Sequence, residues 1–271
     1  EQPSLKADYP LRYFTEDARG RARWPDINLP AFKPQKETLT QFADFIGMEV
    51  SEIEAALSSG YHFWLTPKRG TTEKRLIMAP YPPLKKVQRA ILEWLYTCPV
   101  KISDNTFGCV PGRNTKQNAD FHLINYIFGR REKGKYFSET LNLDIKDAFP
   151  SVRPKQVKMA LSQLDISEEI QEVILHLCMG VLSKTIKEGL PQGAPTSGYL
   201  LNLVLQDLIC ALTNECQKFS CIVSIYVDDI TISGYNLIPD NLRNRAIKLI
   251  KKRGFRVAQR KTKKYQAGEV P

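Results

Sequence analysis

The chain has 271 residues, of which 42% are hydrophobic and 25% are charged, a composition that excludes an intrinsically disordered chain and suffices for a large core. The formal net charge of +10 favours an anionic partner. Six cysteines without a C-x-x-C pair and three histidines exclude the common zinc patterns, and no apolar run reaches membrane-spanning length. We therefore expect a reduced, cytoplasmic protein that has no membrane contact.

The first 60 residues predict an N-terminal extension with short helices. Prolines and charges dominate residues 1–35, which we expect to wrap a surface without forming a core. Apolar residues at helical spacing predict helices over 37–47 and 49–57, and Gly60 predicts their end.

A basic loop, 67–75, separates two short predicted strands, 61–65 and 76–79. Lys and Arg in such a loop can neutralise the oxygens of a triphosphate. An ordinary exposed turn explains the same residues, and the local sequence alone favours it. A helix is predicted next, over 84–96.

Glycine and proline predict a loop over Thr106–Asn114, and a helix then runs from Asn114 or Thr115 through His122. His122 is either a functional residue or a hydrogen-bonded core histidine, and the local sequence favours the core.

The stretch 141–150 predicts a short strand that carries Asp144 and breaks at Pro150. Alternation places the strand's apolar residues on one face and Asp144 on the other. An acid in mid-strand opposes β propensity and requires a partner. Helices are predicted over 154–183.

A tight Pro/Gly loop over 190–197 leads into a long helix, 197–216. Small residues at the beginning of a helix allow another molecule to approach the backbone closely. A simple Pro/Gly turn is the alternative.

Residues 222–234 predict a β-hairpin with Asp228 and Asp229 at its turn. Acids are common at solvated hairpin tips, which is the simplest interpretation. Asp144 lies 84 positions earlier, so only the tertiary fold could bring the three acids together. Three clustered carboxylates would require divalent cations, and oxygen ligands select Mg²⁺. Two such ions, about 4 Å apart, would support nucleotidyl transfer.

Cations accumulate near the end of the chain. Eleven Lys or Arg and no acid occur between Arg243 and Lys264, a density that suits a phosphate backbone.

Several motifs in this order resemble those of reverse transcriptases. Three are similar to the palm motifs: Asp144-x-x-x-Ala148-Phe149, Pro191-Gln192-Gly193-x-Pro195-x-Ser197 and Tyr226-Val227-Asp228-Asp229. Two more are similar to an upstream motif of bacterial and group II intron enzymes and to the next palm motif: Phe107-Gly108 with Pro111-Gly112-Arg113, and Gly254-Phe255 with Lys261-Thr262. The resemblance spans residues 61 to 265.

This resemblance implies an α+β fold with the palm and fingers of a right-hand polymerase, an antiparallel palm sheet backed by helices. The predicted segments are an N-terminal extension, 1–60; fingers, 61–135 and 153–186; and palm, 136–152 and 187–271. The thumb is missing, because the 271 residues end where the primer grip, the retron V-T-G element and the thumb should follow.

The resemblance also implies residue roles. Asp144, Asp228 and Asp229 would be catalytic and would hold two Mg²⁺ ions, with the Ile145 backbone contributing, and Lys261 would donate a proton to pyrophosphate. Phe149 would be a steric gate against the 2′-hydroxyl. The other implied nucleotide-binding residues are Lys68, Lys74, Arg75, Gln192 and Gly193. The implied RNA- and DNA-binding residues are Arg113, Asn118, His122, Tyr226, Arg256 and Arg260.

Asn118-Ala119-x-x-His122 is similar to the N-A-x-x-H element of retron reverse transcriptases. That subfamily implies a structured template RNA, deoxynucleoside triphosphates as substrates, and DNA branched from a guanosine 2′-hydroxyl of the RNA. It also implies a role in anti-phage defence with an effector protein as partner. Val227 departs from the family pattern, since retron enzymes more often carry Ala there.

Two alternatives remain open. One is another bacterial reverse transcriptase, of the group II intron, diversity-generating or abortive-infection type. The other is a catalytically silent RNA-binding scaffold, which the retained acids oppose, because uncompensated buried acids are costly.

Overall fold

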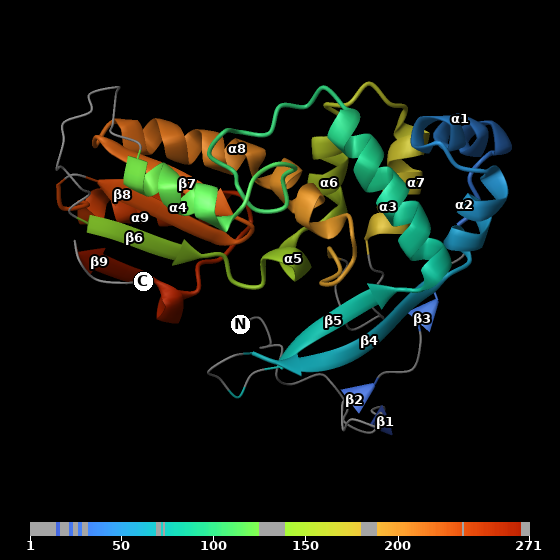
Figure 1. The fold of residues 1–271 in the computed structure, drawn as a ribbon, viewed down its shortest axis with the longest axis horizontal. Coiled ribbons are helices and arrows are strands. Elements are labelled where there is room, and N and C mark those ends of the chain that lie inside the picture. Colours follow the sequence, from blue (N-terminus) through green and yellow to red (C-terminus); the bar gives the residue numbers. More distant parts are fainter. Residues whose placement is uncertain are drawn as a thin grey trace. The chain divides into compact units, whose positions relative to one another are not determined.

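The computed structural model describes residues 32–68, 72, 74–124, 139–179, 189–234 and 236–266, and the backbone of three short strands before them. The chain divides into two compact units, each built from two separate segments (Figure 1). The first unit comprises residues 1–99 and 152–197, and the second comprises 100–151 and 198–271. Residues 100–135, predicted as fingers, group with the second unit. Compactness alone does not distinguish fingers from palm, so the five predicted segments remain a prediction.

The first unit contains a β-hairpin whose strands are longer than predicted. Strand β4 (Gly60–Pro67) pairs antiparallel with β5 (Lys74–Pro80) through seven residue pairs, from Tyr61↔Pro80 to Pro67↔Lys74. Three two-residue strands extend this sheet in the order β1-β2-β4-β3: β1 (Thr15–Glu16), β2 (Ala22–Arg23) and β3 (Ile27–Asn28).

The described helices of the first unit lie where the sequence predicts helices. They are α1 (Lys36–Ile46), α2 (Val50–Leu57), α3 (Pro82–Thr97), α6 (Pro154–Leu161) and α7 (Glu168–Cys178). Gly47 ends α1 because its φ of +63° is easily adopted only without a Cβ. A buried amide joins three elements: Gln88 Nε2 of α3 donates to Tyr61 Oη (2.8 Å) and to the Leu177 carbonyl (2.7 Å).

The second unit is organised around an antiparallel sheet in the order β7-β8-β6-β9. The strands are β6 (Glu139–Asp144), β7 (Cys221–Tyr226), β8 (Asp229–Gly234) and β9 (Lys263–Gln266). The helices are α4 (Thr115–Ile124), α5 (Ala148–Ser151), α8 (Ser197–Gln217) and α9 (Asp240–Lys252), with a 3₁₀ turn, η3 (Gln259–Lys261).

The two faces of this sheet differ in chemistry. One face carries Leu141, Ile230 and Ile232, all at most 1% exposed. Lys264 extends from β9 on that same face to Asp240 at the start of α9, so α9 packs there. The opposite face bears the acids and a set of polar residues aligned by the strand register: Thr140, Asn142, Ser224, Thr231 and Ser233.

These features confirm the α+β class and the antiparallel sheet backed by helices that the sequence predicts. Within the described residues, no helix combines the length and the apolar character needed to cross a bilayer.

Candidate active site

The hairpin predicted over 222–234 forms with a two-residue turn. Tyr226 and Asp229 are the last paired residues of β7 and β8, so Val227 and Asp228 make the turn. Val227 has a φ of +61°, in the left-handed region that hairpin turns require and that β-branched residues rarely adopt. Such a residue persists only where its surroundings hold it.

The strand register brings the distant third acid to this turn. Strand β6 lies beside β8, and Asp144 is directly opposite Asp229. Directly opposed residues in an antiparallel sheet have Cβ atoms about 5 Å apart. The Ile145 N–H also donates to the carbonyl of Asp228 (2.9 Å), which ties the end of β6 to the turn itself. Asp144, Asp228 and Asp229 are therefore neighbours in the second unit.

The electrostatics of the cluster show a surplus of negative charge. Burial, together with the charges of Asp228 and Asp144, raises the pKa of Asp229 to about 6, although part of Asp229 remains exposed. Lys261 offsets part of this charge, because its Nζ lies 2.5 Å from Asp144 Oδ2. That hydrogen bond raises the pKa of Lys261. The Lys261 side chain is 63% exposed and that of Asp144 only 9%, so the cation covers a buried acid from the solvent side.

The donor set fits a hard divalent cation in its chemistry. Carboxylate oxygens with uncompensated charge are the ligands that Mg²⁺ prefers. In the part of the chain that the structure describes, no three His, Cys, Asp or Glu side chains are arranged to hold an ion. The Lys261 ammonium occupies one Asp144 oxygen, and a cation would have to take its place.

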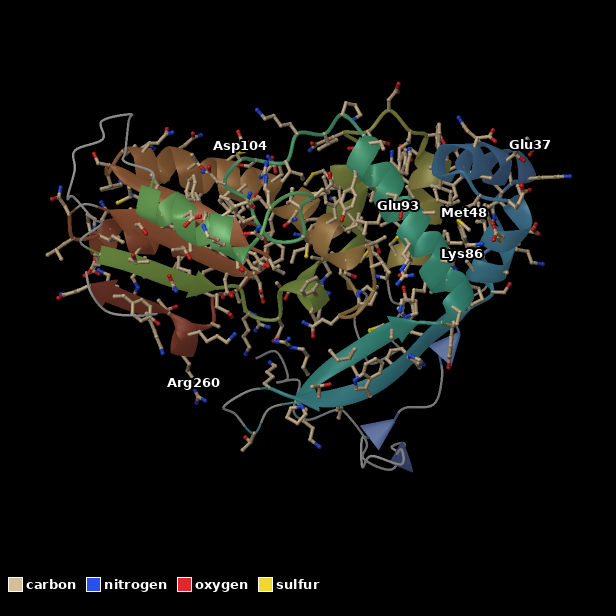
Figure 2. All side chains as sticks on the ribbon, viewed as in Figure 1. Glu37, Met48, Lys86, Glu93, Asp104 and Arg260 are labelled. Carbon is tan, nitrogen blue, oxygen red and sulfur yellow. The ribbon has the colours of Figure 1, made fainter. Side chains whose placement is uncertain are left out.

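Four other predicted residues lie in the same unit. Phe149 is half-buried in α5, five residues beyond Asp144, and Tyr226 is paired with Asp229 on the face that carries the acids. Arg256 is exposed, and its carbonyl accepts from the Lys146 N–H (2.7 Å) beside the strand end. Arg260 lies in η3 and points away from the ribbon (Figure 2).

The structure places three predicted nucleic-acid contacts inside the second unit. His122 is buried, and its Nε2 lies 2.7 Å from Ser224 Oγ on the acid-bearing face. Burial lowers the pKa of His122 to about 4, so its imidazole is neutral at neutral pH. Asn118 Oδ1 is buried and lacks a hydrogen-bond partner among the described residues. Arg113 donates to the carbonyls of Ser103 (2.5 Å) and Thr106 (2.6 Å). The position of His122 thus agrees with the interpretation that the local sequence favours, a hydrogen-bonded core histidine.

The remaining predicted nucleotide contacts belong to the first unit. Lys74 and Arg75 are exposed at the start of β5, and Lys68 follows the end of β4. The Gln192 carbonyl accepts from the Met78 N–H (2.7 Å), and Gly193 has a φ of +118° beside the Met78 carbonyl. Their convergence with the acids stays a prediction.

Three structural contacts of the site were not anticipated from the sequence. Gly108 packs on the Val227 backbone, Asn202 donates to the Gly108 carbonyl, and Ser224 bonds His122. The sequence signals were that Gly108 lies within a quoted motif and that Asn202 lies in the first turns of the long predicted helix, 197–216. The small residue Gly198 at the start of α8 adjoins Cys109 of this same chain, where another molecule was expected.

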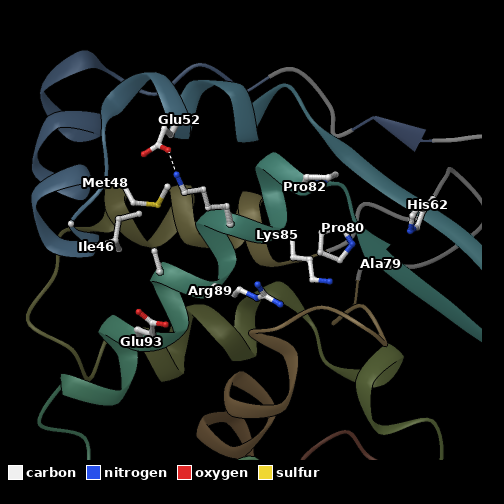
Figure 3. A pocket seen from close by; sticks show the side chains of 13 residues that line it. Ile46, Met48, Glu52, His62, Ala79, Pro80, Pro82, Lys85, Arg89 and Glu93 are labelled. Atoms are coloured by element: carbon white, nitrogen blue, oxygen red, sulfur yellow. Dashed lines mark hydrogen bonds and ion pairs between the residues drawn. The ribbon is translucent and has the colours of Figure 1, made fainter.

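A separate hollow of about 650 Å³ lies in the first unit between α3, the α1–α2 connection and the β4–β5 hairpin (Figure 3). Lys85, Arg89 and Glu93 of α3 line it, and Lys86 pairs with Glu52 at its edge. Its charges are mixed, and it contains none of the predicted site residues.

An antiparallel sheet backed by helices, with acids on a hairpin turn and on the neighbouring strand, is the polymerase palm that the motifs predict. Residues 66–270, more than half of the chain, match the family described as reverse transcriptase (RNA-dependent DNA polymerase). The chain belongs to the reverse transcriptase family.

Similar proteins include reverse transcriptases of retrons. Retron Mx65 reverse transcriptase of Myxococcus xanthus is 30% identical over 221 residues, which cover 77% of this chain and 48% of that protein. Retron Ec83 reverse transcriptase of Escherichia coli is 28% identical over 186 residues, covering 67% of this chain and 55% of that protein. The chain thus spans about half the length of these curated relatives.

The fold also resembles a solved telomerase. Apo telomerase from Candida tropicalis, truncated from its C-terminal domain, superposes with a TM-score of 0.51 at 16% identity. The match covers 77% of this chain and 50% of that one. At this identity the likeness shows a shared palm-and-fingers fold.

Proposed function

We propose that the protein is the RNA-directed DNA polymerase of a retron, which copies a structured non-coding RNA into RNA-linked DNA. The observation that carries the proposal is the pairing of Asp144 with Asp229 beside the Asp228 turn, within a chain of the reverse transcriptase family. The retron names of the similar proteins favour this subtype over group II intron, diversity-generating and abortive-infection enzymes.

Asp144, Asp228 and Asp229, with the Ile145 backbone, would hold two Mg²⁺ ions. When bound, such ions make a primer hydroxyl more nucleophilic and stabilise the charge of departing pyrophosphate. The raised pKa of Asp229 supports this role, because a site built for cations is repulsive without them.

Lys261 would serve as the proton donor to pyrophosphate. Its ion pair with Asp144 keeps it protonated and close to the acids. Its high exposure allows it to exchange Asp144 for a phosphate oxygen at little cost.

Substrate selection would depend on further predicted residues in each unit. Phe149 would pack beneath the sugar and exclude a 2′-hydroxyl, so that deoxynucleoside triphosphates are preferred. In the first unit, Lys68, Lys74 and Arg75 would neutralise the triphosphate, and Gln192 and Gly193 would border the new base pair.

Tyr226, Arg256 and Arg260 would contact the RNA template and the DNA product. The surface of α9 supports a further phosphate contact, since Lys248, Lys251 and Lys252 are exposed on it. The side-chain oxygen of Asn118 is buried, His122 bonds Ser224, and Arg113 bonds the Thr106 carbonyl. Contact of these three side chains with RNA would therefore require rearrangement.

The retron assignment extends to an effector protein as partner, a role in anti-phage defence and action in the cytoplasm. The alternative function is that of a catalytically silent RNA-binding scaffold. That alternative predicts that the three acids can be replaced without loss of function.

The test is to express the full-length protein with its native flanking locus and to digest the co-purifying nucleic acid with RNase or DNase. The control is the double variant Asp228→Asn/Asp229→Asn. A short DNA joined to RNA, missing from the variant, is the expected result. RNA without DNA in both samples would overturn the retron proposal and favour the scaffold.

A further inference from the structure

The turn that carries Asp228 is braced by the loop between α3 and α4, here called the brace loop (residues 103–113). Its backbone runs beside the outer edge of β7: the Ile225 N–H donates to the Asn105 carbonyl (2.8 Å), and the Phe107 N–H donates to the Ile225 carbonyl (2.9 Å). Thr106 and Ile225 form a parallel bridge. The brace loop therefore adds a short extra strand to the sheet, two residues before the turn begins.

Gly108 brings the brace loop into direct contact with the turn. A Cβ on Gly108 would lie 2.6 Å from both Val227 N and Val227 Cγ2, and 3.1 Å from the Tyr226 carbonyl carbon. Two of these atoms are backbone, so no side-chain rotation would make room. Glycine is required here for space, and the contact presses on the residue whose φ is +61°.

Helix α8 holds Gly108 from the other side. Asn202 is 2% exposed, and its Nδ2 donates to the Gly108 carbonyl (2.7 Å). One turn earlier, Gly198 lies so close to Cys109 that a Cβ there would be 2.3 Å from the sulfur. The brace loop is thus clamped between α8 and the turn.

The guanidinium of Arg113 stiffens the brace loop internally. It bonds two carbonyls of the loop and also reaches Asp104 Oδ1 (3.2 Å). From the acid-bearing face, His122 holds Ser224 of β7. The hairpin is therefore supported at its edge, at its turn and on one face by other groups of the second unit.

We propose that Gly108 and Asn202 are positioning residues: they hold the Val227–Asp228 turn in its left-handed conformation and so set the position of the Asp228 carboxylate. The inference rests on the proposed function, because it assigns these residues to the geometry of the same reaction. Arg113 stabilises the brace from within the loop.

The test compares Asn202→Ala with Gln206→Ala in the full-length protein. Gln206 lies one turn further along α8, and its Oε1 accepts from the Ser103 N–H (3.2 Å), at the end of the brace loop away from the turn. Each substitution removes one bond between α8 and the brace loop, but only Asn202→Ala frees the turn. Steady-state primer extension and the melting temperature are measured for both.

Asn202→Ala is expected to lower kcat about 10- to 100-fold, since displacement by about 1 Å suffices for such a loss, with KM for template–primer within about twofold. Gln206→Ala is expected to keep kcat within about threefold. Adding Val227→Gly to Asn202→Ala should restore part of the lost kcat, because glycine adopts the turn conformation without support. Equal losses in the two single variants, or an unchanged kcat in Asn202→Ala, would overturn the proposal.

Hydrogen exchange provides a readout that does not depend on catalysis. In Asn202→Ala the Phe107 and Ile225 amides should exchange about tenfold faster or more, while amides paired between β6 and β8 stay protected. Unchanged exchange at both amides refutes the brace even if the protein polymerises. If the unmodified protein extends no primer, the proposed function fails. Hydrogen exchange at the two amides still tests whether Asn202 holds the brace loop against the turn. Should Asn202→Ala fail to fold, Asn202→Ser, whose hydroxyl is too short to reach Gly108, replaces it.

Discussion

At the scale of single residues, the cluster of Asp144, Asp228 and Asp229 holds like charges close together, which opposes stability. Burial raises the pKa of Asp229, and the neighbouring carboxylates of Asp228 and Asp144 raise it further. Lys261 compensates one of the three charges. The folded state without cations therefore retains repulsion that an unfolded chain does not experience.

Asp228→Asn should separate stability from activity. Removing one charge relieves Asp229, so in metal-free buffer the melting temperature should stay equal or rise by about 1–4 °C. Primer extension should fall by about a thousandfold or more, because a proposed metal ligand is lost. Calorimetry and primer extension measure the two effects.

Asp120→Asn is the matched control for that substitution. Asp120 pairs with Lys116 on the surface of α4 (2.6 Å), so its loss removes an attraction and should not raise the melting temperature. A clear loss of stability in Asp228→Asn, larger than in the control, would contradict the account of the repulsive cluster.

His122 leads to a prediction about pH. Its pKa in the folded state is about 4, below the ordinary value of 6.5, because the imidazole is buried. The unfolded state therefore binds more protons between these values, so stability is complete above about pH 6.5 and decreases as the pH falls toward 4. The full effect is about 3 kcal/mol.

His122→Gln should remove this part of the pH dependence. Urea unfolding at pH 7 and pH 5 should show a smaller loss of stability for the variant than for the unmodified chain. The same two measurements on His176→Gln provide a comparison from the first unit, because burial lowers the pKa of His176 as well. An unchanged pH dependence in His122→Gln would show that the imidazole is protonated or exposed in the folded state.

At the scale of elements, α9 combines two functions on opposite sides. Leu242, Ala246 and Ile250 are fully buried against the unit, while Lys248, Lys251 and Lys252 are exposed. Like charges three and four residues apart destabilise a helix by a few tenths of a kcal/mol each. A polyanion bound on this side would remove that repulsion.

Changing Lys248, Lys251 and Lys252 to Gln should weaken RNA binding and reduce its dependence on salt. The slope of log K against log salt should become shallower by about 2 to 3 if each lysine neutralises one phosphate. Fluorescence anisotropy with a structured RNA, at several salt concentrations, measures both quantities.

A second triple variant controls for net charge. Lys101, Lys116 and Lys218 also lie in the second unit, but each already pairs with an acid: Asp104, Asp120 and Glu215. Their replacement by Gln should leave the salt slope nearly unchanged. The same slope in both variants would mean that α9 contributes only bulk charge.

At the scale of the whole molecule, the predicted site residues are divided between the two units. All three acids and Lys261 belong to the second unit, whereas the basic hairpin and the loop that contains Gln192 belong to the first. The proposed metal ligands therefore lie in the second unit, and the predicted triphosphate contacts lie in the first.

This division predicts where Mg²⁺ should act. In the absence of RNA and nucleotide, millimolar Mg²⁺ should slow hydrogen exchange in peptides covering 139–149 and 221–234 and leave the first unit unaffected. The Asp228→Asn/Asp229→Asn variant should show no such protection. Equal protection in both units, or protection retained in the variant, would argue against a metal site at these acids.

Much of the fold could be predicted from local patterns. Helix α3 and the β7–β8 hairpin follow from the spacing of apolar residues and from Gly and Pro at the ends of elements. The interactions that form such elements join residues close together in the chain. Helices α6 and α7 lie within residues 154–183, which apolar spacing also predicted as helical. The pair Asp228 and Asp229 was recognisable because adjacent carboxylates between apolar strands repel each other and lose hydration.

By itself, the sequence determined the α+β class, the order of the motifs and the family to which they belong, because these depend on residue types and spacing along the chain. Only the tertiary structure decided three further features: Asp144 pairs with Asp229, His122 is buried, and Gly108 packs closely against Val227. The reason is physical. Strand register and close backbone contact join residues about a hundred positions apart, and their energies arise only once both partners are in place.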